Sequence, residues 1–408
     1  MILPNNTMAL SLLLLSLSAA GSAAFAPAFL PSAAPSSPFS PLSMVASSSS
    51  AVGEPGTADL DWANLGFEFR PTKSHLKVVW SVTDEETGEG AWGEPEMVEG
   101  DPYINLHVGA TALHYGQSCF EGLKAFAHGD GSVHLFRPDE NAKRIRSSCE
   151  RLMMPAPPPD FFVEACARVV ADNVAYVPPH GSGGALYLRP LLFGSGPRIG
   201  LQPADEYTLL ILVMPVGDYY KGGLSNPVDA LIIDDFDRAA PRGVGSVKVA
   251  GNYAADLLPN MLGKKRGYPI GLYLDAETQT TVEEFSTSNF VGIDNGEKNY
   301  VTPKSASVLP SITNKSLMQV AEDEGYRVER RDVPLDELET FDEVMAVGTA
   351  VVVTPVGSAT RLGAGDEVKV KYEFSNEVGE TTRKFYDIVR GIQSGEVEDK
   401  HGWNYKVE

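Results

Sequence analysis

Lys248 lies in a stretch of small and apolar residues, 243–253, that offers it no charge partner. Burial among neighbours such as Val247, Val249 and Ala250 disfavours the ammonium form and lowers the pKa of the amine. An uncharged amine can attack a carbonyl, as a lysine that forms a Schiff base must do. The glycines of the stretch would let the backbone approach a bulky group such as a cofactor ring. The stretch predicts either a catalytic lysine or a tight structural turn.

An aldehyde cofactor on this lysine would need an acid that faces its ring nitrogen. Glu283 and Glu284 precede a polar turn that leads into an apolar strand. A buried carboxylate there could hold a pyridine nitrogen protonated and make the ring an electron sink. Two solvated glutamates at a strand end are the alternative reading of the same segment.

A phosphate on such a cofactor would need donors. Ser311 is an N-cap candidate for a helix whose free N–H groups bind phosphate, although every capped helix offers such groups. Thr349 ends a strand and could present its hydroxyl to the same anion. Arg144 could supply a positive charge for the phosphate, but three basic residues within four positions are also typical of the solvent-exposed face of a helix.

Apolar runs bounded by Gly, Pro and Asp predict strands over 207–216, 228–233, 271–274 and 344–353. A hairpin is expected from 288–293 to 299–302, because the Asn295-Gly296 pair tolerates the positive φ of a tight turn. Helices are expected over 254–265, 314–325 and 375–393. Helical spacing also links two sets of residues: Ala142, Ile145, Cys149 and Leu152, and Val163, Cys166, Val170 and Val174. Strands in runs, rather than in strict alternation with helices, predict the fold class α+β.

A polar, glycine-rich break at 217–223 predicts an interdomain linker between two strand-rich halves. The expected organisation is a leader with its linker over 1–55, a smaller domain over 60–216, and a larger domain over 224–408. Ligand sites commonly lie between domains, and Lys248 follows soon after the break. We therefore expect the cofactor at the domain interface.

The first 53 residues contain no charged side chain and carry a leucine-rich run at 8–17, which is typical of a signal peptide. Small residues at 22–24 precede Phe25 and a Ser/Pro-rich segment. This order resembles the bipartite plastid presequence of algae with complex plastids, except that basic residues are missing. We expect plastid import. Secretion and mitochondrial import are the alternatives, but the leader lacks the arginines of a mitochondrial presequence, and Cys119, Cys149 and Cys166 form no disulfide framework.

Composition excludes several other functions. The chain of 408 residues has a formal net charge of −21, from 33 basic and 54 acidic residues. Nucleic acids and anionic membranes require concentrated Lys and Arg, so neither is an expected partner. The sequence has no His-x-x-x-His pair and no Cys-x-x-Cys pair, and no metal site is expected. It also contains no phosphate-binding P-loop and no Gly-x-Ser-x-Gly motif.

From about residue 62 onward, the chain resembles the branched-chain amino-acid aminotransferases, which are fold-type IV pyridoxal-phosphate enzymes with two α/β domains. Besides the lysine stretch at 243–253, the motifs that carry this resemblance are Leu113-His114-Tyr115, Cys119-Phe120-Glu121-Gly122-Leu123-Lys124-Ala125-Phe126, Leu135-Phe136-Arg137-Pro138, Leu186-Tyr187-Leu188-Arg189-Pro190, Glu284-Phe285-Ser286-Thr287-Ser288-Asn289, Leu309-Pro310-Ser311-Ile312-Thr313 and Gly348-Thr349-Ala350. Each motif is moderately specific, but their shared order makes coincidence implausible.

The resemblance implies a role for individual residues. Lys248 would bond to pyridoxal 5′-phosphate and move a proton between the substrate Cα and the cofactor. Tyr253 would hydrogen-bond the phenolate oxygen, and Glu284 the ring nitrogen. The residues implied to hold the phosphate are Arg144, Ile312, Thr313 and Thr349. Those implied on the substrate side are Phe120, Tyr187, Thr287 and Ala350, with Tyr115 reaching over from a second subunit and Arg189 near the pocket.

The implied reaction is the reversible transfer of the amino group of L-Leu, L-Ile or L-Val to 2-oxoglutarate by a homodimer. D-amino-acid aminotransferases and aminodeoxychorismate lyases, which use an equivalent lysine and acid, are alternatives, as is a catalytically silent binding homologue. Two departures from the family pattern stand out. The Cys-x-x-Cys pair that many animal members carry after Gly-Thr-Ala is missing, and Ser311 replaces a glycine that is common there.

Overall fold

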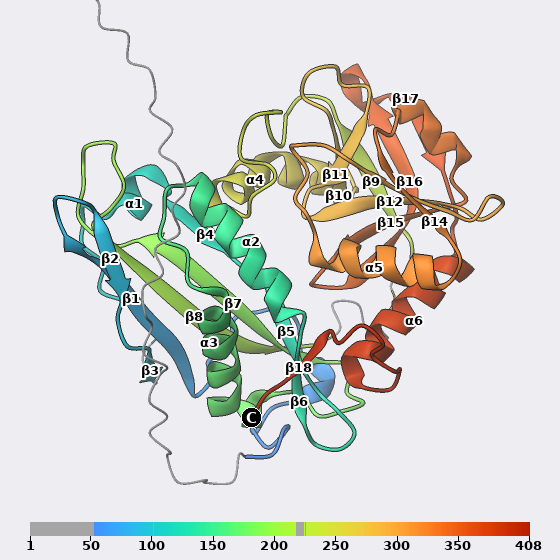
Figure 1. Cartoon of the computed structure of the whole chain (residues 1–408). Coiled ribbons are helices and arrows are strands. Elements are labelled where there is room, and N and C mark those ends of the chain that lie inside the picture. The colour runs from blue at the N-terminus through green and yellow to red at the C-terminus, as the bar shows by residue number, and fades with distance from the viewer. Residues whose placement is uncertain (1–52, 101, 218–223, 225) are drawn as a thin grey trace, which may run out of the picture. The chain divides into compact units, whose positions relative to one another are not determined.

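The computed structural model describes residues 53–100, 102–217, 224 and 226–408 (Figure 1). Residues 1–52 of the expected leader and residues 218–223 of the expected interdomain linker lie outside the described residues. The rest of the chain belongs to one compact unit, Ala51–Glu408, and contains two sheets. The domain boundaries therefore stay a prediction. Helices and sheets are mixed, as the expected α+β class requires.

The first sheet is built mostly from the N-terminal half and has the strand order β18-β6-β5-β7-β8-β1-β2, with β3 beside β1 and β4 beside β7. Its neighbouring strands are antiparallel. The last strand of the chain joins this sheet, so the C-terminus returns to the N-terminal half. The strands are β1 (Ser74–Asp84), β2 (Glu89–Trp92), β3 (Glu96–Glu99), β4 (Ser118–Phe120), β5 (Leu123–Ala127), β6 (Val133–Phe136), β7 (Ala185–Gly194), β8 (Glu206–Val216) and β18 (Asn404–Lys406).

The second sheet has the order β11-β10-β9-β16-β15-β12-β13-β14, with β17 beside β16. Parallel pairs join β9 to β10, β9 to β16 and β13 to β14, and the other pairs are antiparallel. Its strands are β9 (Val228–Ile233), β10 (Ile270–Leu274), β11 (Val282–Phe285), β12 (Ser288–Asp294), β13 (Asn299–Pro303), β14 (Arg327–Arg331), β15 (Glu343–Gly348), β16 (Val352–Leu362) and β17 (Val368–Glu373).

Helices pack on both sheets (Figure 1). Helices α2 and α3 pack against strands of the first sheet, whereas α5 and α6 pack against strands of the second. No helix of the described residues is long and apolar enough to cross a membrane. The helices are α1 (Thr111–Tyr115), α2 (Pro138–Arg151), α3 (Pro159–Asp172), α4 (Ala250–Lys265), α5 (Ile312–Asp323) and α6 (Glu380–Ser394), with short 3-10 turns η1 (Trp62–Asn64), η2 (Val174–Tyr176), η3 (Leu335–Thr340) and η4 (Ala364–Asp366).

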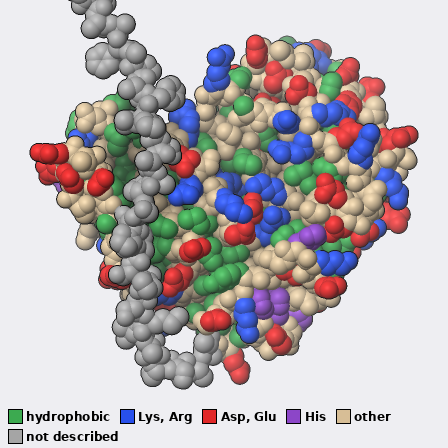
Figure 2. Space-filling view, in the orientation of Figure 1, with side chains coloured by type: hydrophobic (Ala, Val, Ile, Leu, Met, Phe, Trp, Pro, Cys, Tyr) green, Lys and Arg blue, Asp and Glu red, His purple; other side chains and the backbone are tan. Residues whose placement is uncertain are grey.

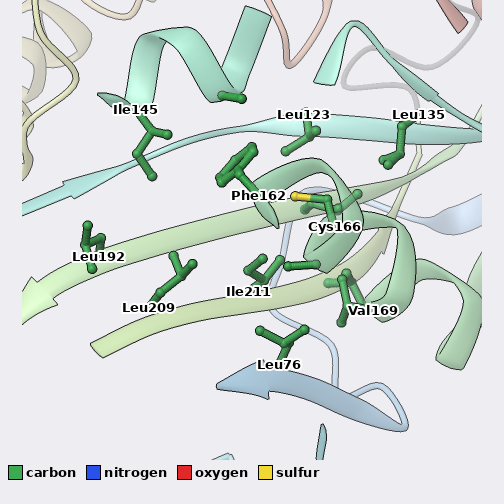
Figure 3. Packing of buried hydrophobic residues seen from close by; sticks show 14 of the residues in the cluster. Leu76, Leu123, Leu135, Ile145, Phe162, Cys166, Val169, Leu192, Leu209 and Ile211 are labelled. Carbon is green, nitrogen blue, oxygen red and sulfur yellow. The ribbon is translucent and has the colours of Figure 1, made fainter. Parts of the chain in front are cut away.

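The helical spacing in the first half correctly predicted α2 and α3. Ile145 and Cys149 of α2 and Cys166 of α3 are fully buried in the core of the first sheet. Figure 3 shows Phe162, Cys166 and Val169 of α3 over Leu209 and Ile211 of β8. The last residue of each of the two predicted helical sets lies outside its helix. Leu152 is the C-cap of α2, and Val174 belongs to η2.

A second core cluster joins the two sheets. Phe126 and Tyr187 from the first sheet share it with Val347 and Val353 from the second, together with Phe385 of α6. Burial of apolar surface contributes roughly 25 cal/mol per Å². The cluster therefore holds together the two sheets that frame the site described below.

The expected single strand over 344–353 is wrong. Residues 349–351 form a turn between β15 and β16, which pair antiparallel from Gly348↔Val352 onward. Val352 has a φ of 65°, a region that a β-branched residue rarely adopts. Both strands are buried, so apolar residues continue on both sides of the turn, and the sequence pattern shows no break.

The other predicted elements need smaller corrections. The hairpin of β12 and β13 is confirmed, but the positive φ of its turn belongs to Lys298, at 53°, and not to the Asn295-Gly296 pair. The last helix begins at residue 380 instead of 375. Its start is fixed by Glu343 of β15, whose carboxylate accepts hydrogen bonds from the N–H groups of Thr381 and Thr382, at 3.1 and 2.8 Å. Because the capping residue is distant in sequence, the residues next to the helix start do not reveal where the helix begins.

Candidate active site

A cavity of about 530 Å³ is lined by residues from both sheets. Its volume lies within the usual range for pockets that bind small molecules. The first sheet and α2 contribute one side, and the β11–β12 turn, the segment before α5 and the β15–β16 turn contribute the other. The residues that line it include Phe120, Arg144, Tyr187, Arg189, Arg238, Lys248, Tyr253, Glu284, Thr287, Asn289, Leu309, Ser311, Thr349 and Ala350.

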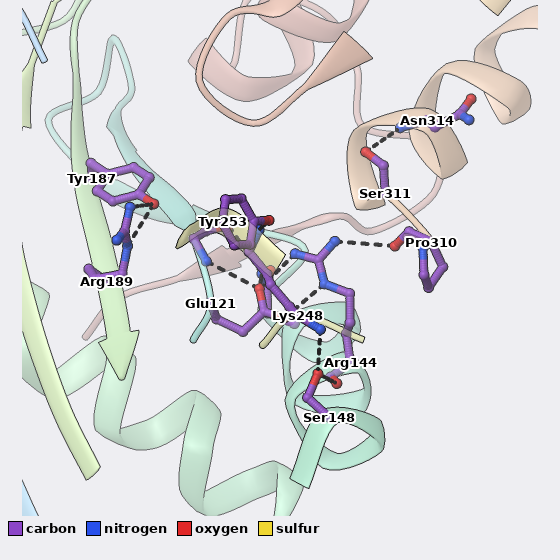
Figure 4. A network of polar contacts seen from close by, with 12 residues as sticks. Glu121, Arg144, Ser148, Tyr187, Arg189, Lys248, Tyr253, Pro310, Ser311 and Asn314 are labelled. Atoms are coloured by element: carbon purple, nitrogen blue, oxygen red, sulfur yellow. Dashed lines mark hydrogen bonds and ion pairs between the residues drawn. The ribbon is translucent and has the colours of Figure 1, made fainter. Parts of the chain in front are cut away.

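The backbone of Lys248 is fixed to the first half of the chain. Its N–H donates to Ser148 Oγ of α2 at 2.9 Å, and its carbonyl accepts from the N–H of Phe120 at 3.1 Å (Figure 4). A β-bridge between Cys119 and Val249 continues this contact. The lysine precedes α4, so it joins that helix to β4 and α2.

The side chain of Lys248 ends at the cavity. Nζ donates to Tyr253 Oη at 2.7 Å and lies 4.6 Å from the ring centroid of Phe120. Lys248 is half-buried and lines the cavity. Burial, together with the positive charge of Arg144, lowers the pKa of Lys248 to about 7. The environment therefore favours an uncharged amine near neutral pH, as the sequence suggested.

The glycines near Lys248 serve a different purpose from the expected one. A Cβ at Gly245 would collide with the backbone carbonyl of Ser307, so this glycine permits two chain segments to approach each other. A Cβ at Gly251 would point into open space. Neither residue lines the cavity. Phe120 and Tyr253 line it instead.

Glu284 lies in β11 and is buried, which rules out the alternative of two solvated glutamates. Its Oε1 accepts the N–H of Leu309 at 3.1 Å and is ion-paired with Arg238, and its Oε2 accepts from Asn289 Nδ2 at 2.8 Å. Burial raises the pKa of Glu284 to about 7, although Arg238 acts in the opposite direction. Glu283 contacts Ser305 instead, at 2.7 Å, as expected from alternating side chains in a strand.

Arg144 is buried, whereas the neighbouring bases Lys143 and Arg146 are exposed. The alternative, that Arg144 lies on the solvent-exposed face of the helix, is therefore wrong. Its guanidinium is held by Glu121, with Nε–Oε1 and Nη2–Oε2 distances of 2.8 and 2.7 Å, and Nη1 donates to the carbonyl of Pro310 at 3.2 Å (Figure 4). These contacts place a positive charge beside the turn that leads into α5.

Ser311 caps α5, because its Oγ accepts from the N–H of Asn314 at 3.3 Å. The N-cap prediction is confirmed. Ser311 and Thr349 line the cavity, whereas Ile312 and Thr313 do not line it and are buried as the first two residues of the helix. The N-terminus of α5 thus borders the cavity next to Arg144, where an anion would meet N–H groups and a guanidinium.

The expected substrate residues Phe120, Tyr187, Thr287 and Ala350 line the cavity, as does Arg189. The guanidinium of Arg189 donates to Tyr187 Oη from Nε at 3.1 Å and from Nη2 at 2.9 Å. It also lies 4.7 Å from the ring centroid of Phe120. This side of the cavity combines aromatic surface with one cation.

Tyr115 does not line the cavity of its own chain. It ends α1, is 43% exposed, and donates its hydroxyl hydrogen to the carbonyl of Ile199. The expectation that it serves the site of a second subunit stays a prediction.

Sequence reasoning missed Arg238, Asn289 and Glu121 as members of the site. Glu121 and Asn289 stand inside motifs that were recognised, so their positions in the motifs were the available signal. Arg238 lies in the segment between β9 and α4 and forms part of no motif. Its contact with Glu284 joins segments that are distant in sequence, and spacing along the chain does not reveal such a contact. In the part of the chain that the structure describes, no cluster of His, Cys, Asp and Glu could hold a metal ion.

Comparison with known proteins places these residues in a family context. The family model described as Amino-transferase class IV matches residues 118–359. The chain is 44% identical over 356 residues to a branched-chain-amino-acid aminotransferase of Haemophilus influenzae, covering 86% of this chain and 99% of the relative. It is 42% identical to the chloroplastic branched-chain-amino-acid aminotransferase 3 of Arabidopsis thaliana, covering 89% of this chain and 84% of the relative.

A solved structure agrees with the sequence comparison. The branched-chain amino acid aminotransferase of Escherichia coli superposes with a TM-score of 0.65 at 29% identity, covering 77% of this chain and 97% of that one.

Proposed function

Because the chain belongs to the class IV aminotransferase family, we propose that it is a pyridoxal-phosphate-dependent transaminase of branched-chain amino acids. It transfers the amino group of L-Leu, L-Ile or L-Val reversibly to 2-oxoglutarate. The observation that carries this proposal is the amine of Lys248, which ends between Phe120 and Tyr253 in a cavity that also holds a buried acid, Glu284.

The residues around the cavity fit this cofactor. Lys248 provides an amine for its aldehyde, and Glu284 an acceptor for its ring nitrogen. Tyr253 provides a hydroxyl group for its phenolate oxygen. The phosphate is held by Arg144, Thr349 and the first N–H groups of α5, at Ile312 and Thr313. When bound, pyridoxal 5′-phosphate supplies a ring that accepts the electron pair of the substrate's Cα–H bond.

Lys248 moves the proton. An amine with a pKa near 7 can both accept and release a proton at neutral pH. Once the substrate's amino group has taken its place on the cofactor, the free amine of Lys248 would take the proton from the substrate Cα and deliver it to the cofactor carbon that carries the substrate's nitrogen. Tyr253 orients the amine through its hydroxyl group. The buried apolar neighbours Val247 and Val249 keep water away from the part of the Lys248 side chain next to the backbone, and this burial keeps the pKa of its amine low.

The substrate side explains a preference for branched apolar side chains. Phe120 and Tyr187 offer aromatic surface, and each buried methylene group contributes about 0.8 kcal/mol. The same cavity must accept 2-oxoglutarate, which carries a second carboxylate. Arg189 is the cation on this side of the cavity, and we assign it to a substrate carboxylate.

A second copy of the chain completes the site. The segments around α1 and around residue 199 lie together, because Ala110 forms a β-bridge with Pro197. They expose a group of apolar side chains next to Tyr115, namely Val108, Leu113, Ile199 and Leu201. Exposed apolar patches of this kind mark interfaces between proteins. In a homodimer, Tyr115 reaches the cavity of the other subunit.

We further propose that the enzyme acts in a plastid. The uncharged leader with its leucine-rich run supports this location, and so does a relative that is named chloroplastic. The acidic side chains spread over the face shown in Figure 2 suit a soluble stromal enzyme. A fluorescent fusion of residues 1–60 should accumulate in plastids of an alga with complex plastids. Its appearance in the medium would exclude this location.

An amino-donor screen tests the reaction itself. With 2-oxoglutarate as acceptor, the purified protein should form L-glutamate from L-Leu, L-Ile and L-Val. The D-enantiomers and L-Asp serve as controls and should give no product. Turnover with D-amino acids alone would identify a D-amino-acid aminotransferase. A protein that neither binds pyridoxal 5′-phosphate nor turns over any donor would be a silent homologue.

A further inference from the structure

Arg238 lines the cavity beside Glu284 and is fixed by two contacts. Its guanidinium is ion-paired with Glu284 Oε1, and its Nη2 donates to the backbone carbonyl of Ser307. Both side chains of the pair are less than a tenth exposed. Arg238 comes from the segment between β9 and α4, so the pair joins this segment to β11.

The contacts of Glu284 are divided unequally between its two oxygens. Oε1 is ion-paired with Arg238 and accepts from the N–H of Leu309, whereas Oε2, among the described residues, accepts from Asn289 Nδ2 alone. A carboxylate offers about four acceptor positions, roughly two on each oxygen. The occupied positions fix the rotation of the group. The position left open is on Oε2, in a carboxylate that lines the cavity.

The charge of Glu284 also depends on its surroundings. A buried carboxyl group without a cation takes up a proton, because desolvation penalises the anion. The charges of Arg238 and Glu283 shift the pKa of Glu284, and the charge of Glu284 in turn shifts the pKa values of Lys248 and Tyr253. Among these groups, Arg238 is the cation in direct contact with the carboxylate, and Glu283 adds a negative charge that disfavours ionisation.

We propose that Arg238 is a positioning residue, which keeps Glu284 ionised and turned so that Oε2 presents its open acceptor position to the ring nitrogen of the cofactor. This inference rests on the proposed function. It adds that the ring nitrogen stays protonated because of an arginine that acts through Glu284. With a neutral Glu284, the ring nitrogen would have no anion to hold its proton.

A cofactor analogue tests the proposal directly. In the analogue, a C–H group replaces the ring nitrogen of pyridoxal 5′-phosphate, so Glu284 has no N–H to accept. Affinities of the natural cofactor and of the analogue for apo-enzyme are measured by titration, for the wild type and for Arg238→Gln. The variant should bind the natural cofactor about 10- to 100-fold more weakly, the range for a lost hydrogen bond to a charged group. It should bind the carbon analogue as tightly as the wild type, or more tightly.

Two further variants make the test decisive. Arg238→Lys keeps the charge and should bind the natural cofactor more tightly than Arg238→Gln. Arg361→Gln is the matched control. Arg361 forms an ion pair at 2.9 Å with Asp234, which lies in the same segment after β9 as Arg238, but Arg361 does not line the cavity. It should leave both affinities unchanged.

The outcomes separate this inference from the proposed function. If Arg238→Gln weakened both ligands equally, Arg238 would merely support the fold of the site, and the inference would be wrong. The same conclusion would follow if the variant weakened neither ligand. If the wild type itself failed to bind pyridoxal 5′-phosphate, the proposed function would fall instead. Should Arg238→Gln not fold, the comparison of Arg238→Lys with the wild type on the two ligands decides by the same criterion.

Discussion

At the scale of single residues, the site is built around two groups whose charged forms are disfavoured by burial. Lys248 has a pKa lowered to about 7, and Glu284 has a pKa raised to about 7. Each shift is a cost to folding that the cofactor-free protein bears near neutral pH. Sites of catalysis often carry such costs, because the perturbed groups are needed for the reaction.

The cost at Lys248 predicts a stabilising substitution. Below pH 7 both the folded and the unfolded chain bind the lysine proton, and the folded state is penalised in full. Between pH 7 and about 10.4 the unfolded state binds more protons, so the penalty shrinks as pH rises. Lys248→Met should therefore raise the Tm of the cofactor-free protein at pH 7, and the gain should disappear towards pH 10.5. Scanning calorimetry across this range checks it, and a gain that grew with pH would contradict the assigned pKa.

Glu284 allows a prediction about rate. Glu284→Gln keeps the size of the side chain but removes the negative charge that favours a protonated ring nitrogen. At saturating cofactor the variant should remain loaded, while kcat falls by about 100-fold, as for other preorganised electrostatic groups. The KM for L-Leu should change little. The measurement is steady-state kinetics, together with an absorption spectrum that shows the variant to be loaded with cofactor. Full activity would show that Glu284 is not the partner of the ring nitrogen.

At the scale of elements, the turn between β15 and β16 is the part that the sequence did not predict. Apolar residues on both sides concealed the break, although the Gly348-Thr349-Ala350 motif itself was recognised. The strand pairing around it is regular, and Val352 accommodates the turn with a positive φ. Lys124 of β5 is buried and donates from Nζ to the carbonyl of Ala350 at 2.7 Å. A residue of the first sheet thus holds a turn of the second.

Lys124 predicts an effect on substrate binding. Lys124→Met has a similar length but cannot donate to the carbonyl of Ala350, so the turn beside the substrate should loosen. The KM for L-Leu should rise roughly 10-fold, equivalent to about 1.4 kcal/mol, with a smaller change in kcat. Lys143→Met, on the exposed face of α2, is the control and should behave as wild type. An unchanged KM for Lys124→Met would show that the turn is held by other contacts.

At the scale of the whole molecule, the α+β class and the family followed from local patterns, since each motif is a short continuous segment of the chain. Residues inside motifs, such as Lys248 and Tyr253, could be placed at the site from the sequence. Arg238 could not, because it reaches Glu284 only through the fold, and the charge of Glu121 on Arg144 likewise depends on packing. The domain boundaries also depend on packing, since a shared core and β18 connect the two halves.

The proposed homodimer gives a prediction at this scale. Leu201 is 83% exposed within the apolar group beside Tyr115. Leu201→Asp should place a charge in the interface, shift the protein towards monomer in analytical ultracentrifugation, and lower activity, because Tyr115 would no longer reach the other subunit. Val368→Asp, at another exposed apolar position in β17, should change neither. Monomeric protein with full activity would contradict a shared site.

A covalent bond between Lys248 and the cofactor can be detected directly. Borohydride reduction of the loaded enzyme fixes a reducible carbon–nitrogen bond, and peptide mass spectrometry then locates the modified lysine. The mass of the reduced cofactor should appear on the peptide that contains Lys248, and it should be lost when L-Leu is added before reduction without an oxo acid. Labelling of Lys124, a buried lysine that contacts Ala350 at the edge of the cavity, or labelling that L-Leu does not prevent, would show that Lys248 does not form this bond.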